Sequence, residues 1–529
     1  MPDETCYITT PIYYVNDKPH IGHVYTTTVC DVWARFMRFC GRDVFFLTGT
    51  DEHAAKVVDA AAERGLTAQE WADQNAAAFE AIFRRLGMTN DDFIRTSQQR
   101  HREKVTEYVK ALLESGDVYL GDYEGWYDAD QEEYIPASKA GEYDYQSPIT
   151  GKPLVRKTEK NYFFRLSEYR EALLGHFEEH GAFVLPEARR NEIIARIKDA
   201  EDVPISRTGA GDWGIRVPGD DEHTIYVWID ALFNYLTTVD TAERRRYWPP
   251  AYHLIAKDIL WFHGCIWPAV LMALRKLPGY EWVGLFERLY AHSFWISEGQ
   301  KMSKSLGNFI DLAAIEHYVE VYSLDMWRYF LATQGPLGAT DADFAAAHFH
   351  EVYNTDLVNT VGNCASRVTA MISKYFEGAT PTELLAGSRL VVGGYDWPVS
   401  AAEAVGTAMR AMEAFDLPGA IGAALALIRR VDGFINQTEP FKLAKDETKR
   451  EELGAILYQC VEAVRIASLV LWPVMPEKTG RLWEALGLEI DPARQRLSDL
   501  ADWGGMQPGT KVEQIALFPR IDWPQAAPA

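Results

Sequence analysis

The stretch that decides the fold reads TCYITTPIYY at residues 5–14 and DVFFLTGT at residues 43–50. Both segments are short runs of β-branched and aromatic residues, a composition typical of buried strands. Gly41 is placed to stop a helix between them. That helix, over residues 20–40, is predicted from apolar or small side chains that recur on one stripe: Ile21, Val24, Tyr25, Thr28, Val32, Phe36 and Phe39. Strand, helix and strand in succession form a βαβ unit, so we predict a parallel sheet.

Length and composition limit the class of protein. The 529 residues predict three or four domains, since one domain has roughly 100–200 residues. A hydrophobic share of 47% with 24% charged residues excludes disordered, collagen-like and coiled-coil classes. No apolar run reaches the roughly 18 residues of a membrane span, and the acidic N-terminus does not resemble a secretory signal. The six scattered cysteines lack a disulfide or CxxC pattern, so a cytoplasmic chain without membrane contact is expected.

The rest of the chain divides into regions of different pattern. Residues 117–223 are rich in Tyr, Gly, Asp and Pro, as expected of an inserted domain. From about residue 346 the pattern is continuously helical, which predicts a bundle. Further strands are predicted at 224–230, 253–258 and 289–295, and helices at 55–86, 98–115 and 258–277.

Two short motifs carry the chemistry. Residues 19–23 (PHIGH) lie between a strand and a helix, where free N–H groups and the helix dipole favour a phosphate. His20 and His23 share one face of the first helical turn, and Gly22 leaves room for a flat ligand. Residues 301–308 (KMSKSLGN) place two lysines in a loop that could surround an anionic leaving group. Taken singly, the first motif could equally be a helix cap and the second a solvated basic turn.

Together the two motifs resemble the signature pair of class I aminoacyl-tRNA synthetases. Longer blocks in the same order are similar to methionyl-tRNA synthetases: TTPIYYVNDKPHIGHVYTT, FFLTGTDEH, VWIDALFNYL, AKDILWFH with IWPA, QKMSKSLGN, DLVNTVGN with SR, and NQTEPFKLAK. The resemblance implies an α/β fold, in which a Rossmann-type parallel-sheet catalytic domain with an inserted connective domain precedes an α-helical anticodon-binding bundle. The implied domains are 1–116 and 224–290 for the catalytic halves, 117–223 for the connective domain, 291–345 for the KMSKS and stem-contact region, and 346–529 for the bundle.

The resemblance also implies the reaction and the residues that perform it. Methionine is activated with ATP to methionyl-adenylate, and the methionyl group is then transferred to the 3′-terminal adenosine of tRNA(Met), for both initiation and elongation. His20, His23, Lys301 and Lys304 would be catalytic, and Gly22 and Ser303 would join them in binding ATP, with Mg²⁺ on the nucleotide. The implied methionine-binding residues are Ile12, Tyr14, Asp51, Trp228, Ala231, Leu232, Tyr235, Ile259, His263 and Trp267. Residue types agree, because an apolar aromatic cavity with few polar groups suits a polarizable thioether.

The helical region would read the anticodon. Asn363 and Arg367 are four residues apart and can face one base, and Phe441 stands where the family usually has tryptophan. A surface pair and a core phenylalanine are the plainer alternatives. The chain stops after the bundle, without the appended oligonucleotide-binding domain of some relatives, so a monomer is expected.

Several positions depart from the family. Cysteine is absent between Cys40 and Cys265, and the acidic residues of the connective domain (Asp128, Asp130, Glu132 and Glu133) are poor structural zinc ligands, so no zinc and no other metal site is predicted. Ala54, Ala256 and Ser293 stand where glycine is usual, which leaves the local loop geometry open.

Two other classes of protein share parts of this pattern. A leucine, isoleucine or valine enzyme would carry a larger editing insertion, and a non-catalytic tRNA-binding scaffold would have lost the signature motifs. The formal charge of −23, from 53 basic and 76 acidic residues, argues against a partner held by a general basic field. It does not exclude local basic patches that contact one tRNA.

Overall fold

The fold is built on a seven-stranded sheet in a computed structural model. The structure describes residues 4–130, 133–135, 137–208, 213–302, 308–382, 384–385, 388–389 and 394–522. The strand order is β2-β3-β1-β13-β14-β8, with β4 also paired to β3, and every pairing is parallel. The strands are β1 Thr5–Thr9, β2 Tyr13–Tyr14, β3 Asp43–Asp51, β4 Asp92–Arg95, β8 Val184–Leu185, β13 Ala251–Ala256 and β14 Arg288–His292. The predicted α/β class with a parallel sheet is confirmed.

Alternating side chains of the central strands supply two separate cores. Cys6 and Ile8 of β1 pack with α1 on one face, whereas Tyr7 between them packs with α4 on the other. The pattern follows from the two-residue period of a strand. The helices of this part are α1 Ile21–Phe39, α2 Ala55–Ala62, α3 Ala68–Arg85, α4 Gln99–Ser115, α6 Arg170–Glu179, α7 Glu187–Lys198, α8 Val227–Leu232, α9 Asn234–Thr237, α10 Trp267–Arg275, α11 Leu312–Val321 and α12 Leu324–Gln334.

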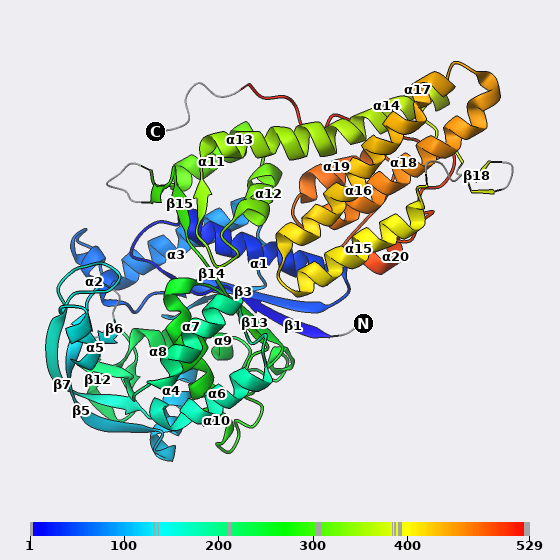
Figure 1. Ribbon diagram of the computed structural model, residues 1–529. Helices are drawn as coiled ribbons and strands as arrows, with labels where there is room; N and C mark the ends of the chain where they lie inside the picture. The colour runs from blue at the N-terminus through cyan, green and yellow to red at the C-terminus, as the bar shows by residue number, and fades with distance from the viewer. Residues whose placement is uncertain are drawn as a thin grey trace.

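The region 117–223 contributes to more than one sheet. Its long antiparallel ribbon forms the sheet β6-β5-β7-β9, seen at the lower left of Figure 1. β8, α6 and α7 return to the main sheet and pack in its core. The further elements are β5 Val118–Asp128, β6 Glu133–Ile135, α5 Ala137–Glu142, β7 Val155–Phe164, β9 Val203–Pro204, β10 Ser206–Thr208, β11 Arg216–Val217 and β12 Asp220–Ile225.

The predicted strand at 224–230 is wrong. β12 ends at Ile225 in a small antiparallel sheet, Tyr226 caps the next helix, and α8 starts at Val227. The apolar run TIYVWID spans the end of one element and the start of another, and a run of this length does not distinguish a strand from a buried helix.

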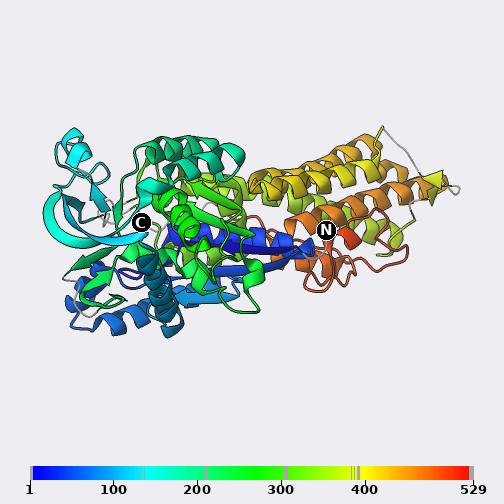
Figure 2. The same cartoon turned by 90° about the horizontal axis from the view of Figure 1, so that it is seen from below.

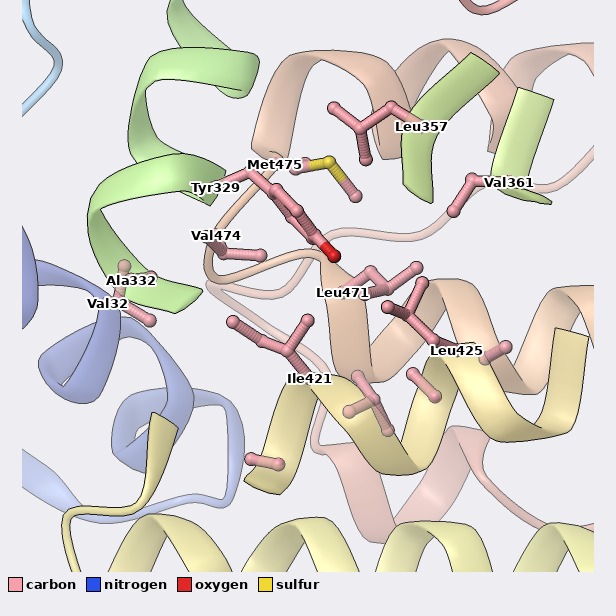
Figure 3. Close-up of a cluster of buried hydrophobic side chains, with 14 of the residues drawn as sticks. Val32, Tyr329, Ala332, Leu357, Val361, Ile421, Leu425, Leu471, Val474 and Met475 are labelled. Carbon is pink, nitrogen blue, oxygen red and sulfur yellow. The ribbon is translucent and has the colours of Figure 1, made fainter. Parts of the chain in front are cut away.

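The helical C-terminal region extends away from the sheet along one long axis (Figure 2). Side chains from α1, α12, α16 and α18 form one continuous core across the junction (Figure 3). Arg328 of α12 lies buried there, donates to Asp31 of α1 at 2.6 Å and to the backbone of Pro473 at 3.0 Å. The elements are α13 Ala346–Val352, a π-helix Tyr353–Gly362, α14 Asn363–Phe376, β18 Leu384–Leu385, β19 Ser388–Arg389, α15 Trp397–Glu413, α16 Leu417–Thr438, α17 Pro440–Leu443, α18 Arg450–Leu471, α19 Pro476–Ala485 and α20 Leu497–Leu500.

One helix in the described part of the chain, Glu447–Leu471, is long and apolar enough to cross a membrane by length and composition alone. Its apolar window is entirely buried inside the protein, where it packs against α14, α15 and α16. Such a helix satisfies the same test when it is the central helix of a bundle.

Candidate active site

A cavity of about 490 Å³ lies at the carboxyl ends of the central strands. β1 lies between β3 on one side and β13 on the other, so the connections leave this point in opposite directions. Ligands bind in such a crevice in open parallel sheets. The lining includes Ile12 after β1, Asp51 at the end of β3, Ala256 at the end of β13 and His292 at the end of β14.

The cavity brings together most of the residues that the sequence places in a site. His20, Gly22 and His23 line it from the start of α1. The lining also includes nine of the implied methionine-binding residues: Ile12, Tyr14, Asp51, Trp228, Ala231, Leu232, Tyr235, Ile259 and His263. The motif at residues 19–23 and the apolar pocket therefore open into one continuous space.

Trp267 does not line the cavity. A regular helix would place Ile259, His263 and Trp267 on one face, but residues Lys257–Ile259 form a 3₁₀ turn and Phe262–Ile266 a π-helix. A π turn holds more residues than an α turn, so a spacing of four no longer keeps one face. Trp267 is fully buried behind the wall, with its ring 6.0 Å from that of Tyr235.

His20 and His23 cap the helix that they begin. Nδ1 of His20 accepts from the N–H of Gly22 at 3.1 Å, and Nδ1 of His23 accepts from the N–H of His20 at 3.2 Å. Because a backbone N–H only donates, both neutral rings carry their proton on Nε2. Burial, followed by the neighbouring His20, lowers the pKa of His23 well below its usual range, so the ring stays neutral. The cap thus presents Nε2–H donors.

The expected free N–H groups at this helix start are already used. The N–H of Ile21 donates to the carbonyl of Ile310 at 3.1 Å, and those of Gly22 and His23 donate to the His20 ring. A phosphate at this end would meet imidazole donors and the helix dipole. Gly22 allows a close approach of the His20 ring, since a Cβ there would lie 3.0 Å from Cε1 of His20.

The second motif is only partly described. Lys301 lies exposed in β16 (Gln300–Lys301) and does not line the cavity, while Ser303 and Lys304 lie outside the described residues. Asn308 donates to the carbonyl of Lys301 at 3.2 Å. Phe309 lies against His20 with ring centroids 5.0 Å apart, so the chain after the loop is held at the start of α1. The adjoining strands are β15 Trp295–Ser297 and β17 Ala342–Phe344.

The apolar end of the cavity holds a fixed tyrosine–histidine pair. The hydroxyl of Tyr235 lies 2.8 Å from Nε2 of His263, and Nδ1 of His263 lies 3.0 Å from the carbonyl of Ile259. The carbonyl only accepts, so Nδ1 donates and Nε2 accepts from Tyr235. Burial lowers the pKa of His263 to about 4, which keeps this neutral tautomer.

Aromatic rings complete the wall of this end. Trp228 stacks on Phe262 with ring centroids 4.1 Å apart and an interplanar angle of 12°. Asp51, only 2% exposed, is the polar group at the end of β3. An acidic side chain beside an aromatic wall can bind the ammonium group of an amino acid whose side chain enters the apolar part.

The inserted region forms part of the rim. Nζ of Lys56 donates to the carbonyl of Asp130 at 2.5 Å, and both residues line the cavity. Lys152 forms an ion pair with the Asp130 carboxylate at 3.0 Å. Ile149, half exposed, also reaches the cavity. Asp130, one of the acidic residues of this region, is therefore paired with a lysine.

Several lining residues were not foreseen from the sequence. Asn234, Phe262 and His292 line the cavity, as does Phe309 after the lysine motif. His292 is buried, with Nε2 2.8 Å from the hydroxyl of Thr26 and Nδ1 2.7 Å from the carbonyl of Ser293. Their only signal in the sequence was position, since each adjoins a motif or the end of a strand.

The three positions where glycine is usual are not strained. Ala54 has φ −65° and Ala256 has φ −84°, which any residue adopts. Ser293 is not among the described residues with positive φ, and its hydroxyl accepts from Arg189 at 3.2 Å. Ala256 and Ser293 line the cavity, so their side chains reduce its width without distorting the loops.

The three residues implied for the anticodon lie in the helical region. Asn363, at the start of α14, and Phe441 of α17 are exposed, the latter by 47%. Arg367 donates to Asp432 at 2.8 Å and to Asn436 at 3.2 Å, both on α16. Phe441 follows α16 by three residues and is neither a core residue nor covered by a neighbour to any large extent.

Metal-ligating side chains do not gather in the part of the chain that the structure describes: no group of three His, Cys, Asp or Glu there could hold an ion. The expectation that the protein carries no structural zinc stays a prediction.

Four buried histidines predict that acid destabilises the protein. Burial lowers the pKa of His263 and of His292 to about 4, and that of His23 and His253 well below 6.5. Below pH 6.5 these histidines bind protons in the unfolded chain but stay neutral in the folded protein. The free energy of unfolding therefore decreases as pH falls from 6.5 towards 4, by up to about 1.4 kcal/mol per pH unit for each histidine. Burial also raises the pKa of Asp325 to about 6 and raises those of Asp91, Asp258 and Asp432, which opposes part of this decrease.

The check is the thermal midpoint measured between pH 7 and pH 5. We expect a clear decrease, with a smaller slope in His292→Asn, where the amide replaces the Nδ1 donor to the Ser293 carbonyl without titrating. A midpoint independent of pH over this interval would contradict the burial of neutral histidines.

The comparisons with known proteins agree with this site. The family described as "tRNA synthetases class I (M)" matches residues 6–143 and 143–369. The methionine–tRNA ligase of Halalkalibacterium halodurans is 39% identical over 98% of this chain and 79% of its own length. That of Streptomyces coelicolor is 40% identical over 98% of this chain and 97% of its own.

Solved structures are similar over almost the whole chain. Mycobacterium tuberculosis methionyl-tRNA synthetase in complex with methionyl-adenylate is 34% identical, with a TM-score of 0.89 over 98% of this chain and 100% of the other. The apo form of that enzyme has a TM-score of 0.83, with 32% identity over 98% of each chain. With these relatives and the matching family, the chain belongs to the methionyl-tRNA synthetases, within the class I aminoacyl-tRNA synthetases.

Proposed function

We propose that this protein is a methionine–tRNA ligase. It activates L-methionine with ATP to methionyl-adenylate and transfers the methionyl group to the 3′-terminal adenosine of tRNA(Met), with release of pyrophosphate and AMP. The observation that carries the proposal is the single cavity of about 490 Å³, because it joins the histidine pair at the start of α1 to an apolar pocket beside Asp51. An amino acid and a nucleotide can lie end to end in it.

The amino acid occupies the apolar end in this proposal. Asp51 accepts hydrogen bonds from the substrate ammonium group, and Trp228, Ala231, Leu232 and Ile259 enclose the side chain. The Tyr235–His263 pair offers a polar face without a charge, because His263 is neutral. A thioether is polarizable and needs no strong donor, whereas a charged or amide side chain would lose its hydration there without replacement.

The nucleotide occupies the other end. The methionine carboxylate attacks the α-phosphorus of ATP, the bond from that phosphorus to the bridging oxygen breaks, and pyrophosphate leaves. No protein nucleophile is required, so the protein contributes position and charge stabilisation. Nε2–H donors of His20 and His23 face the phosphates, Gly22 lets the nucleotide approach, and Lys301, Ser303 and Lys304 are proposed to contact the departing pyrophosphate.

Further parts of the proposal concern the surroundings of the reaction. Mg²⁺ is proposed to arrive with the triphosphate, where phosphate oxygens and water supply most of its ligands. The enzyme is proposed to act as a cytoplasmic monomer on both initiator and elongator tRNA(Met). The domain limits given above, with a connective domain at 117–223 and an anticodon-binding bundle at 346–529, are part of the same proposal.

Anticodon recognition is proposed for Asn363, Arg367 and Phe441. The exposed ring of Phe441 offers a surface on which an unpaired base can stack, a contact worth about 1–3 kcal/mol per base. Arg367 is held by Asp432 and Asn436, so its guanidinium has a defined position beside α16.

Charging of tRNA tests this part. Phe441→Ala is expected to lower kcat/KM for tRNA(Met) by about tenfold while leaving methionine-dependent ATP–pyrophosphate exchange unchanged. Met409→Ala, which removes another exposed apolar side chain of the bundle, is the control and should leave both rates unchanged. Equal charging of tRNA(Met) by the wild type and Phe441→Ala would remove this residue from anticodon reading.

A further inference from the structure

A buried carboxylate joins two histidines beside the amino-acid end of the cavity. Oδ2 of Asp230 lies 2.6 Å from Nδ1 of His53, and Oδ1 lies 2.8 Å from Nε2 of His101. Nδ1 of His101 lies 2.9 Å from the hydroxyl of Thr237. Each of these side chains is at most 6% exposed. The cluster uses four polar groups far from solvent, yet none of His53, His101 and Asp230 lines the cavity.

The cluster connects the two sides of the amino-acid pocket. His53 follows Asp51 by two residues at the end of β3, and Asp230 lies in α8 between Trp228 and Ala231. His101 belongs to α4, which packs beneath both. The acidic wall and the apolar wall of the pocket are thus joined through a single carboxylate.

The segment that carries Asp51 is held from the other side as well. The carboxylate of Glu52 accepts from Arg95 at 2.6 and 3.0 Å and from the hydroxyl of Ser97 at 2.5 Å. The carbonyl of Glu52 accepts from the indole N–H of Trp213 at 2.6 Å. Glu52 is therefore fixed to β4 and the chain after it, and His53 is fixed to α8, with Asp51 immediately before them.

We propose that His53, Asp230 and His101 are positioning residues that set the distance between Asp51 and the Trp228–Leu232 wall, and so determine the affinity for methionine. The inference rests on the proposed function. None of the three touches the substrate. Their effect passes through Asp51 and α8, so it concerns the amino acid and leaves the nucleotide end unaffected.

The hydrogen-bond pattern specifies which nitrogen matters. A carboxylate only accepts, so Nδ1 of His53 and Nε2 of His101 both donate to Asp230. Burial raises the pKa of Asp230, but the two histidines outweigh it and lower the pKa to about 2, which keeps the carboxylate charged. An asparagine amide places its N–H₂ group close to the Nδ1 position of a histidine, so His53→Asn retains the donor that His53→Ala removes.

The experiment measures ATP–pyrophosphate exchange with methionine and with ATP varied separately. In His53→Ala we expect the KM for methionine to rise about tenfold or more, because a displacement of about 1 Å at a site can cost up to 100-fold, with the KM for ATP changed by less than about twofold. His53→Asn should restore the methionine KM to within about threefold of the wild type. Asp230→Asn, which keeps the side-chain volume, should raise the KM for methionine and not that for ATP. This variant tests the inference even if His53→Ala fails to fold.

A matched control exists in the same chain. His223 is also buried and donates through Nδ1 to a carboxylate, that of Asp220, at 2.8 Å, but it lies in β12 and does not line the cavity. His223→Ala should lower the thermal midpoint and leave both KM values unchanged.

Three results would overturn the inference: an unchanged methionine KM in both His53→Ala and Asp230→Asn, an equal increase of both KM values, or an equal effect of His223→Ala on the methionine KM. If the wild type shows methionine-dependent exchange and one of these results is obtained, the positioning role alone is rejected. Absence of methionine-dependent exchange in the wild type rejects the proposed function as well.

Discussion

Asp51→Asn is expected to lower kcat/KM for methionine by about 100-fold or more, because removing one partner of a buried charge pair costs about 2–5 kcal/mol or more. Asp51 ends β3, is 2% exposed and lines the amino-acid part of the cavity. The amide keeps the volume and loses the charge that would face the substrate ammonium group. The KM for ATP should change by less than about threefold, since the nucleotide lies at the other end.

The measurement is ATP–pyrophosphate exchange at varied methionine, with Asp130→Asn as the control. Asp130 also lines the cavity but lies at the rim, where its carboxylate pairs with Lys152. We expect near wild-type kinetics for the control. A kcat/KM for Asp51→Asn within about threefold of the wild type would place the ammonium group elsewhere.

His23→Asn is expected to lower the kcat of exchange by about 100- to 1000-fold, the range measured when one donor to a developing charge is removed. The asparagine oxygen can replace Nδ1 as acceptor of the His20 N–H, so the helix cap is retained. The Nε2–H donor is lost. The KM for methionine should stay within about threefold, because His23 lies at the phosphate end of the cavity.

This substitution separates the two roles of the histidine. A purely structural cap predicts near wild-type exchange in His23→Asn and a loss only in His23→Ala. Phosphate stabilisation predicts a comparable loss of kcat in both variants, with the thermal midpoint of His23→Asn close to that of the wild type. Normal kcat in His23→Asn would contradict a role in catalysis.

The sequence predicts the centre of the fold better than its edges. The alternation of Cys6, Tyr7 and Ile8 and the stripe of α1 are local patterns, and the structure forms α1 and β3 at the predicted places. The strand predicted over residues 5–14 is divided into β1 and the short β2. The strand predicted over TIYVWID was wrong because the end of β12 and the start of α8 together form one apolar run. The pairing of β12 with β10 stops at Ile225, opposite Ser206, and the composition of the run alone does not reveal that limit.

The site shows the same limit. Most of the lining lies at strand ends, where position in the sequence predicts position in the cavity. The prediction placed Trp267 in the cavity because periodicity assumes a regular helix, whereas the π-helix Phe262–Ile266 changes the period. The N–H groups of α1 were expected to be free, but the carbonyl of Ile310 takes the first of them, a contact across almost 300 positions. The link between His53, Asp230 and His101 likewise joins residues that no local pattern connects.

Net charge was the least informative feature. A formal charge of −23 argues against a general attraction to RNA. One tRNA touches only particular faces, so this enzyme is proposed to hold it by local contacts, with weak binding to unrelated RNA.

The protein is proposed to activate methionine with ATP inside one cavity. The most direct test is ATP–pyrophosphate exchange with the purified protein across the twenty amino acids, without tRNA. We predict exchange with methionine far above that with leucine, isoleucine or valine. Exchange that prefers another amino acid, or no exchange with any of them, would contradict the account.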